Sequence, residues 1–126
     1  FRRVLFRSID GDFDGLVYPF VLQWGEEDDA RLIRLQAQGL AAPHPLGEIE
    51  LQRAVFAVHN PRAVRDRWQR LFGFTPQGEL GLEVGGREFI FRHGAANQLT
   101  ELVFRVADPA LKGRRFRVGN GEYLFE

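Results

Sequence analysis

The sequence predicts an α+β fold in which one main helix packs on a curled sheet with mixed or antiparallel strands. Residues 49–58 alternate as a half-buried strand, and residues 61–72 place apolar side chains at helical spacing. Strand-like segments follow at 80–84, 87–92 and 99–106. Strand, helix and three strands in this order form a βαβββ unit.

Each element of this unit has local support. The alternation in the first strand places four side chains on each face of the sheet: Gln52, Ala54, Phe56 and Val58 on one, and Leu51, Arg53, Val55 and Ala57 on the other. Asn60 is a good N-cap for the helix, and Pro61 suits its first turn. Val64, Trp68, Leu71 and Phe72 form one apolar stripe, and Gly73 ends the helix.

Glycine pairs mark the turns of the sheet. Gly85-Gly86 predicts a hairpin between the second and third strands of the unit. Residues 114–118 and 122–125 flank Gly119-Asn120-Gly121, which predicts a C-terminal hairpin.

The upstream part contains fewer clear elements. Residues 16–24 are apolar and aromatic, so we expect a strand, with Pro19 at an edge or a bulge. The acidic residues 26–29 open a short surface helix that ends near Gly39. Residues 41–47 contain two prolines and form a linker.

The first eight residues are interpreted as an artefact. The sequence contains no methionine among its 126 residues. Residues 1–8 match the translation of a common sequencing-adapter oligonucleotide, and Arg7 interrupts the apolar stretch that a signal peptide would need. We therefore expect residues 1–8 to pack poorly and the chain to be an N-terminally truncated fragment.

Composition excludes several classes of function. Lys and Arg total 17, and so do Asp and Glu, so the net charge gives no reason to expect nucleic acid or an anionic membrane as partner. The chain has no cysteine, which excludes disulfides and thiolate metal sites. No apolar run approaches the ~20 residues of a membrane span. We expect a cytoplasmic protein.

Sequence motifs point to a family. Residues 51–58, Asn60-Pro61 and the Leu71-Phe-Gly-Phe74 segment resemble the opening strand, turn and helix end of glyoxalase and bleomycin-resistance-type proteins. Upstream, residues 18–25 and the His-Pro-Leu-Gly segment 44–47 resemble the glyoxalase-like domain family. Both belong to the vicinal oxygen chelate superfamily, which also includes dioxygenases.

The resemblance implies a domain organisation. In this superfamily two βαβββ units pair, and their sheets curl around a metal cleft. Residues 9–47 would then be the end of a preceding unit with its linker, and residues 48–126 a βαβββ unit with a C-terminal hairpin. A missing upstream unit or a homodimer partner would cover the sheet face that the helix leaves open.

The resemblance also indicates where a metal would bind. The opening strand of the superfamily carries a ligand, usually histidine, at the position of Arg53, and arginine is not a metal ligand because it stays protonated. A second ligand is usually a glutamate on a late strand, here Glu88 or Glu101. His44 is a weak further candidate, while His59 and His93 show no ligand spacing and are interpreted as surface histidines. No metal or other cofactor is therefore expected in this stretch, although a divalent metal in the full-length protein stays open.

A cluster of charged residues is the main candidate for a ligand site. By strand alternation Arg53, Glu101 and Arg105 can share the concave face with Glu88, and arginines beside carboxylates can hold an anionic ligand. Trp24 could line the same cleft. The alternative is a set of structural ion pairs at the seam with a second unit, which we favour.

Three functions remain. The stretch is a metal-free unit that binds a small molecule, a structural unit that completes a barrel or dimer, or part of a metal-dependent lyase, isomerase or dioxygenase whose ligands lie mostly upstream. We favour a metal-free structural or binding role for this stretch.

Overall fold

A computed structural model describes residues 25–126 of the chain. Three predictions fall outside these residues: the poor packing of residues 1–8, the strand over 16–24 and the position of Trp24.

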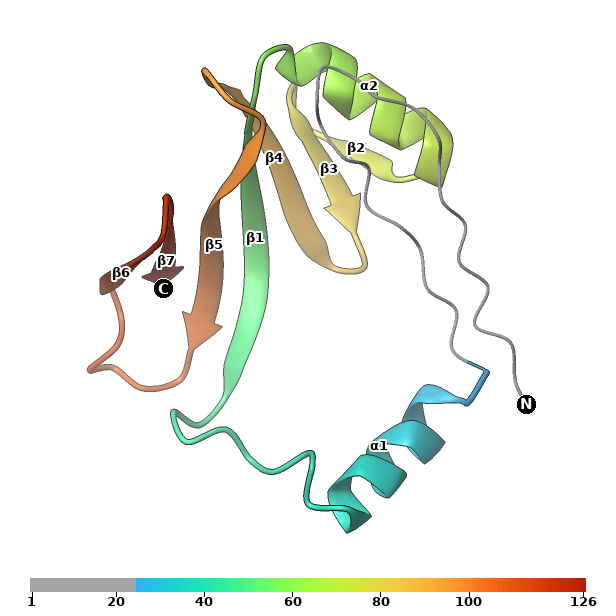
Figure 1. The fold of residues 1–126 in the computed structure, drawn as a ribbon, viewed down its shortest axis with the longest axis vertical. Helices are drawn as coiled ribbons and strands as arrows, with labels where there is room; N and C mark the ends of the chain where they lie inside the picture. Colours follow the sequence, from blue (N-terminus) through green and yellow to red (C-terminus); the bar gives the residue numbers. More distant parts are fainter. Residues whose placement is uncertain (1–24) are drawn as a thin grey trace.

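The described part contains two helices and seven strands (Figure 1). In chain order these elements are α1 (Asp28–Ala37), β1 (Ile49–Val58), α2 (Pro61–Phe72), β2 (Thr75–Gln77), β3 (Gly81–Val84), β4 (Arg87–His93), β5 (Gln98–Val106), β6 (Arg115–Val118) and β7 (Gly121–Phe125). The predicted α+β class is confirmed. Six predicted strands and both helices are present, with bounds shifted by at most a few residues, and β2 is the strand that the sequence did not predict.

The strands form one sheet in the order β2-β3-β4-β1-β5-β7-β6. β1 pairs antiparallel with β5 at the centre of this sheet. On one side of the centre β4 runs parallel to β1 and β3 antiparallel to β4. On the other side β7 runs parallel to β5 and β6 antiparallel to β7. An approximate two-fold axis between β1 and β5 therefore relates the two halves of the sheet.

Local signals fix the path from β1 into α2. The side chain of Asn60 accepts a hydrogen bond from the main-chain nitrogen of Ala63 at 3.1 Å, which satisfies one free amide of the first turn. Gly73 then adopts a left-handed conformation with φ of 69° and ends the helix. The predicted cap and stop are both confirmed.

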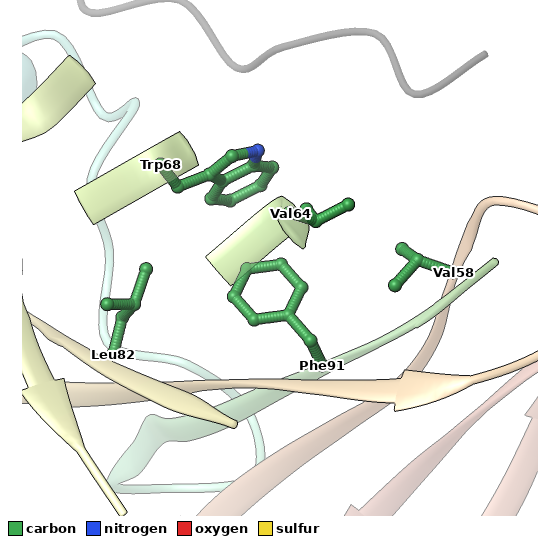
Figure 2. Packing of buried hydrophobic residues seen from close by; sticks show 5 residues of the cluster. All are labelled: Val58, Val64, Trp68, Leu82 and Phe91. Atoms are coloured by element: carbon green, nitrogen blue, oxygen red, sulfur yellow. The ribbon is translucent and has the colours of Figure 1, made fainter. Parts of the chain in front are cut away.

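The core lies between α2 and the first half of the sheet. Val58, Val64, Trp68, Leu82 and Phe91 are fully or almost fully buried there. Figure 2 shows the Trp68 ring above the Phe91 ring, and their centroids lie 5.1 Å apart in an edge-to-face arrangement. α2 thus covers β1, β3 and β4 through Val64, Trp68 and Phe72 of its predicted apolar stripe, whereas Leu71, the fourth residue of that stripe, is 38% exposed.

Two-residue turns close both predicted hairpins. Gly85 and Gly86, between β3 and β4, have φ values of 57° and 77°, which a residue with a side chain adopts only with strain. Gly119 and Asn120 connect β6 to β7. These turns place neighbouring strands in fixed register and so decide which side chains share a face.

The face opposite α2, called the open face below, carries most of the charged strand residues. Arg53 on β1 lies opposite Glu88 on β4 and opposite Val103 on β5. Glu101 and Arg105 lie two residues to either side of Val103, on the same face by alternation. The register therefore places Arg53, Glu88, Glu101 and Arg105 on one face, as the sequence predicts.

Candidate functional site

The most closely paired charges of the open face are Arg53 and Glu88. Their strands are parallel neighbours, and the Nε of Arg53 donates a hydrogen bond to Oε2 of Glu88 at 2.8 Å. The two side chains are 33% and 26% exposed. Partial burial reduces the screening of this pair by water, so the interaction is stronger than that of a fully exposed pair.

Arg53 lies in a carboxylate-rich environment. The hydrogen bond that Arg53 donates to Glu88 raises the pKa of Arg53 above its usual value, against the opposing effect of burial, and the negative charges of Glu88, Glu126 and Glu101 add to the rise. The guanidinium of Arg53 is therefore a permanent cation at the centre of the open face.

A second group of charges crosses from β5 to β6. Glu101 and Glu122 lie side by side on the parallel strands β5 and β7. The Nη1 of Arg115 lies 2.7 Å from Oε1 of Glu122 and 3.8 Å from Oε2 of Glu101. Glu101 is the more buried of the two carboxylates, with 15% of its side chain exposed. Arg115 compensates two carboxylates that would otherwise repel each other.

Arg105 belongs to a separate, exposed pair. Its guanidinium bonds Glu50 on β1, and the two side chains are 66% and 47% exposed. Arg53 and Arg105 thus share a face but bind different carboxylates. The four predicted residues Arg53, Glu88, Glu101 and Arg105 are distributed over three ion-paired groups.

The residues of the open face do not fit a divalent metal. Glu88 binds the guanidinium of Arg53, and residues 25–126 contain no group of three or more His, Asp or Glu side chains placed to hold an ion. His44 accepts a hydrogen bond at Nδ1 from the main-chain nitrogen of Leu46 at 3.1 Å, in the linker turn. His59 follows β1 and His93 ends β4, and both are exposed.

An open cavity of about 240 Å³ lies where β5 and β7 begin. Its lining mixes apolar side chains with two carboxylates, a phenol and an amide, from Leu99, Thr100, Glu101, Leu102, Val118, Asn120, Gly121, Glu122 and Tyr123.

The site residues Arg115, Glu122 and Glu126 were not predicted. Their signal was the strand alternation of the tail, but only the pairing of β7 with β5 brings Glu122, and with it Arg115 on β6, to Glu101.

The fold and the open face define the class of protein. In the structure the strands of the βαβββ unit are β1, β2, β3 and β4, because β5, the last strand of the unit expected from the sequence, pairs on the other side of β1 and begins the second half of the sheet. This unit, β1-α2-β2-β3-β4, forms one half of a curled sheet whose other face stays open, which is the arrangement of the vicinal oxygen chelate superfamily. A model of the glyoxalase-like domain family matches residues 2–72, more than half of the chain. The chain belongs to this glyoxalase-like domain family.

One solved structure has a similar fold. It is the crystal structure of a hypothetical protein from Staphylococcus aureus, with a TM-score of 0.74 and 18% sequence identity. The match covers 94% of this chain and 46% of that one, so the chain spans about half the length of its structural neighbour. No curated protein matches the chain significantly.

Between residues 25 and 126 there is no helix with the length and apolar character needed to cross a membrane.

Proposed function

We propose that this stretch is a metal-free structural and small-molecule-binding unit of a larger glyoxalase-like cleft. The observation that carries the proposal is the 2.8 Å hydrogen bond from Arg53 to Glu88. Arg53 stands where the superfamily resemblance expects a metal-binding histidine, and Glu88 stands on a late strand of the same unit.

The chemistry of arginine supports a metal-free role. A guanidinium does not lose its proton at any physiological pH and has no lone pair for a metal. Its fixed positive charge beside Glu88 also repels a divalent cation. The guanidinium of Arg53 therefore takes the place of a metal cation and balances the negative charge of the carboxylates around it.

The ion pairs also support a structural contribution. Glu88, Glu122 and Glu50 each bind an arginine of another strand. An anionic ligand would have to displace one of these carboxylates. The open cavity beside Glu101 has room for a small molecule, and we propose that it contributes one wall of the cleft.

Metal analysis of the purified chain tests the proposal. After dialysis against Mn²⁺, Co²⁺, Ni²⁺ or Zn²⁺ and then against metal-free buffer, we expect well below one ion per chain by elemental mass spectrometry. One tightly bound ion per chain that is lost in Glu88→Ala or Glu101→Ala, but kept in the control Glu50→Ala, would overturn the proposal. It would favour the alternative, a part of a metal-dependent lyase, isomerase or dioxygenase.

A further inference from the structure

The turn between β6 and β7 contains an asparagine that is followed by a glycine. Gly119 and Asn120 form this turn, and Gly121 begins β7. Gly119 is left-handed, with a φ of 59°, and Asn120 is exposed. Among residues 25–126, the side chain of Asn120 makes no hydrogen bond. The amide group of Asn120 is therefore open to water and is not held in one orientation.

The other two asparagines of the chain are held by hydrogen bonds. Oδ1 of Asn60 accepts the main-chain amide of Ala63, and Oδ1 of Asn97 accepts that of His59, each at 3.1 Å. The residue after Asn60 is a proline, which has no N–H, and the residue after Asn97 is a glutamine. Asn120 therefore differs from both in its unbound side chain and in the glycine that follows it.

The packing of the sheet favours glycine at position 121. A Cβ on Gly121 would lie 3.1 Å from the carbonyl oxygen of Thr100 and 3.4 Å from that of Leu99, both on the neighbouring strand β5. A side chain at this position would push the start of β7 away from β5. The fold thus retains, next to Asn120, the residue type that shields its own main-chain nitrogen least and restricts the backbone least.

We propose that Asn120 is a site of spontaneous deamidation. The main-chain nitrogen of Gly121 attacks Cγ of Asn120, and the bond from Cγ to the side-chain nitrogen breaks. The proton of the attacking nitrogen passes through water to the leaving group, which departs as ammonia, and a succinimide ring remains. Water then opens the ring at either of its carbonyl groups and gives an aspartyl or an isoaspartyl residue. The net reaction consumes one water and exchanges the amide for a carboxylate.

Both products add a negative charge to a group that already contains two carboxylates. Asn120 lines an open cavity with Glu101 and Glu122, and a neighbouring one with Arg117 and Glu122. Arg115 lies 2.7 Å from Glu122 and 3.8 Å from Glu101, so one guanidinium is already shared between these two charges. A carboxylate at position 120 therefore makes both cavities more negative.

The isoaspartyl product also lengthens the turn. Its main chain runs through Cβ and Cγ of residue 120, which adds one methylene group between β6 and β7. The length of a hairpin turn sets the register of its strands, and this hairpin pairs Val118 with Gly121 and holds Arg115 against Glu122. The isoaspartyl chain should therefore be less stable than an aspartyl chain of the same charge.

Peptide mass spectrometry tests the reaction. Trypsin cleaves after Lys and Arg, so it releases each asparagine in a separate peptide, 54–62, 93–105 or 118–126. The full chain is incubated in mildly alkaline buffer made with water that carries a heavy oxygen isotope, and samples are digested over time. We expect peptide 118–126 to become the labelled acid at least about tenfold faster than peptide 93–105, because glycine follows its asparagine. Peptide 54–62 should stay an amide.

Asn120→Gln is the matched control for this experiment. It keeps an uncharged amide in the turn, but the same attack would have to close a larger ring. Its peptide should stay an amide while peptide 93–105 reacts as before. Equal rates at Asn120 and Asn97 would overturn the proposal, and so would an acid that forms equally fast in Asn120→Gln.

Thermal unfolding tests the effect on the hairpin. The products of the aged chain are separated by chromatography, and the isoaspartyl fraction is identified with a methyltransferase specific for isoaspartyl carboxylates. Its unfolding midpoint should lie below that of Asn120→Asp, which has the same charge and a normal main chain. Equal midpoints would show that the turn accommodates the longer link, and would overturn the effect proposed for the hairpin. Asn120→Gln, aged for the same time, should keep its midpoint.

Discussion

Arg53 and Glu88 lie directly opposite each other on the parallel strands β1 and β4, joined by a 2.8 Å hydrogen bond. Thirty-five residues separate them in sequence, including α2 and two further strands. The pair therefore links the first and last strands of the βαβββ unit, and it does so on the face opposite α2. Its strength can be measured without knowledge of any ligand.

A double-mutant cycle should show that these two side chains are coupled. Arg53→Met and Glu88→Gln each remove one charge and keep most of the side-chain volume. Each should lower the free energy of unfolding by about 1–2 kcal/mol, because a half-buried partner loses its hydrogen bond. In the double variant the loss of unfolding free energy, measured by urea unfolding, should be about 1 kcal/mol smaller than the sum of the two single losses.

The exposed pair of Arg105 and Glu50 is the control for this cycle. Both side chains are more exposed than those of Arg53 and Glu88. Arg105→Met and Glu50→Gln should therefore couple by less than about 0.5 kcal/mol. Equal coupling in the two cycles would contradict the assignment of Arg53–Glu88 as the stronger pair.

Trp68 should be the most sensitive position of α2. Its side chain is 2% exposed and contacts the rings of Phe56, Phe89 and Phe91. Trp68→Ala should lower the free energy of unfolding by about 3–5 kcal/mol through lost burial and a cavity. Leu71→Ala, at a position 38% exposed, should cost less than about 1.5 kcal/mol in the same denaturation experiment. Similar losses would mean that α2 does not pack through Trp68.

Gly94 should tolerate no side chain next to Ala57. A Cβ on Gly94 would lie 2.6 Å from the Cβ of Ala57, closer than two carbon atoms can approach. Gly94→Ala should therefore lower the midpoint of thermal unfolding, with a loss of about 1–3 kcal/mol. Combining it with Ala57→Gly removes the contact, so the double variant should be less destabilised than the two single effects added. If the destabilisation of the double variant equalled the sum of the two single effects in the melting curves, this would argue against the close approach of Gly94 and Ala57.

Asn60 should stabilise the start of α2 through its side chain. Its Oδ1 accepts the Ala63 amide, and Asn60→Ala should cost about 1 kcal/mol in chemical denaturation. Asn60→Asp keeps an acceptor at the same place and should lose little. If Asp and Ala were equally destabilising, the cap would not be the cause.

Much of the local structure could be predicted from the sequence. The bounds of β1 and α2 agree with the predicted residues, because alternation, a capping asparagine and a terminal glycine are each encoded within a few positions. β2 gives no such signal. It has three residues, one of them Pro76, and all three are exposed, so neither burial nor alternation marks it.

The candidate site could be predicted only in part. Alternation places Arg53, Glu101 and Arg105 on one face, and the register agrees. It does not say which carboxylate each arginine binds. Arg115 and Glu122 reach Glu101 because β7 pairs parallel with β5, and that pairing connects residues about twenty positions apart.

The sequence by itself determined the chain order of β1, α2, β3, β4 and β5, the burial of Val64 and Trp68 on α2, and the presence of an arginine at position 53, where the family resemblance leads us to expect a ligand histidine. These features are local, because they depend on the spacing of apolar residues along a strand or helix and on the chemistry of single side chains. Only the tertiary structure decided that β5 lies beside β1, that Arg53 binds Glu88 rather than Glu101, and that the face on β5, β7 and β6 carries no helix among residues 25–126. Strand order depends on which distant segments bury each other's surfaces, and no local pattern specifies that choice.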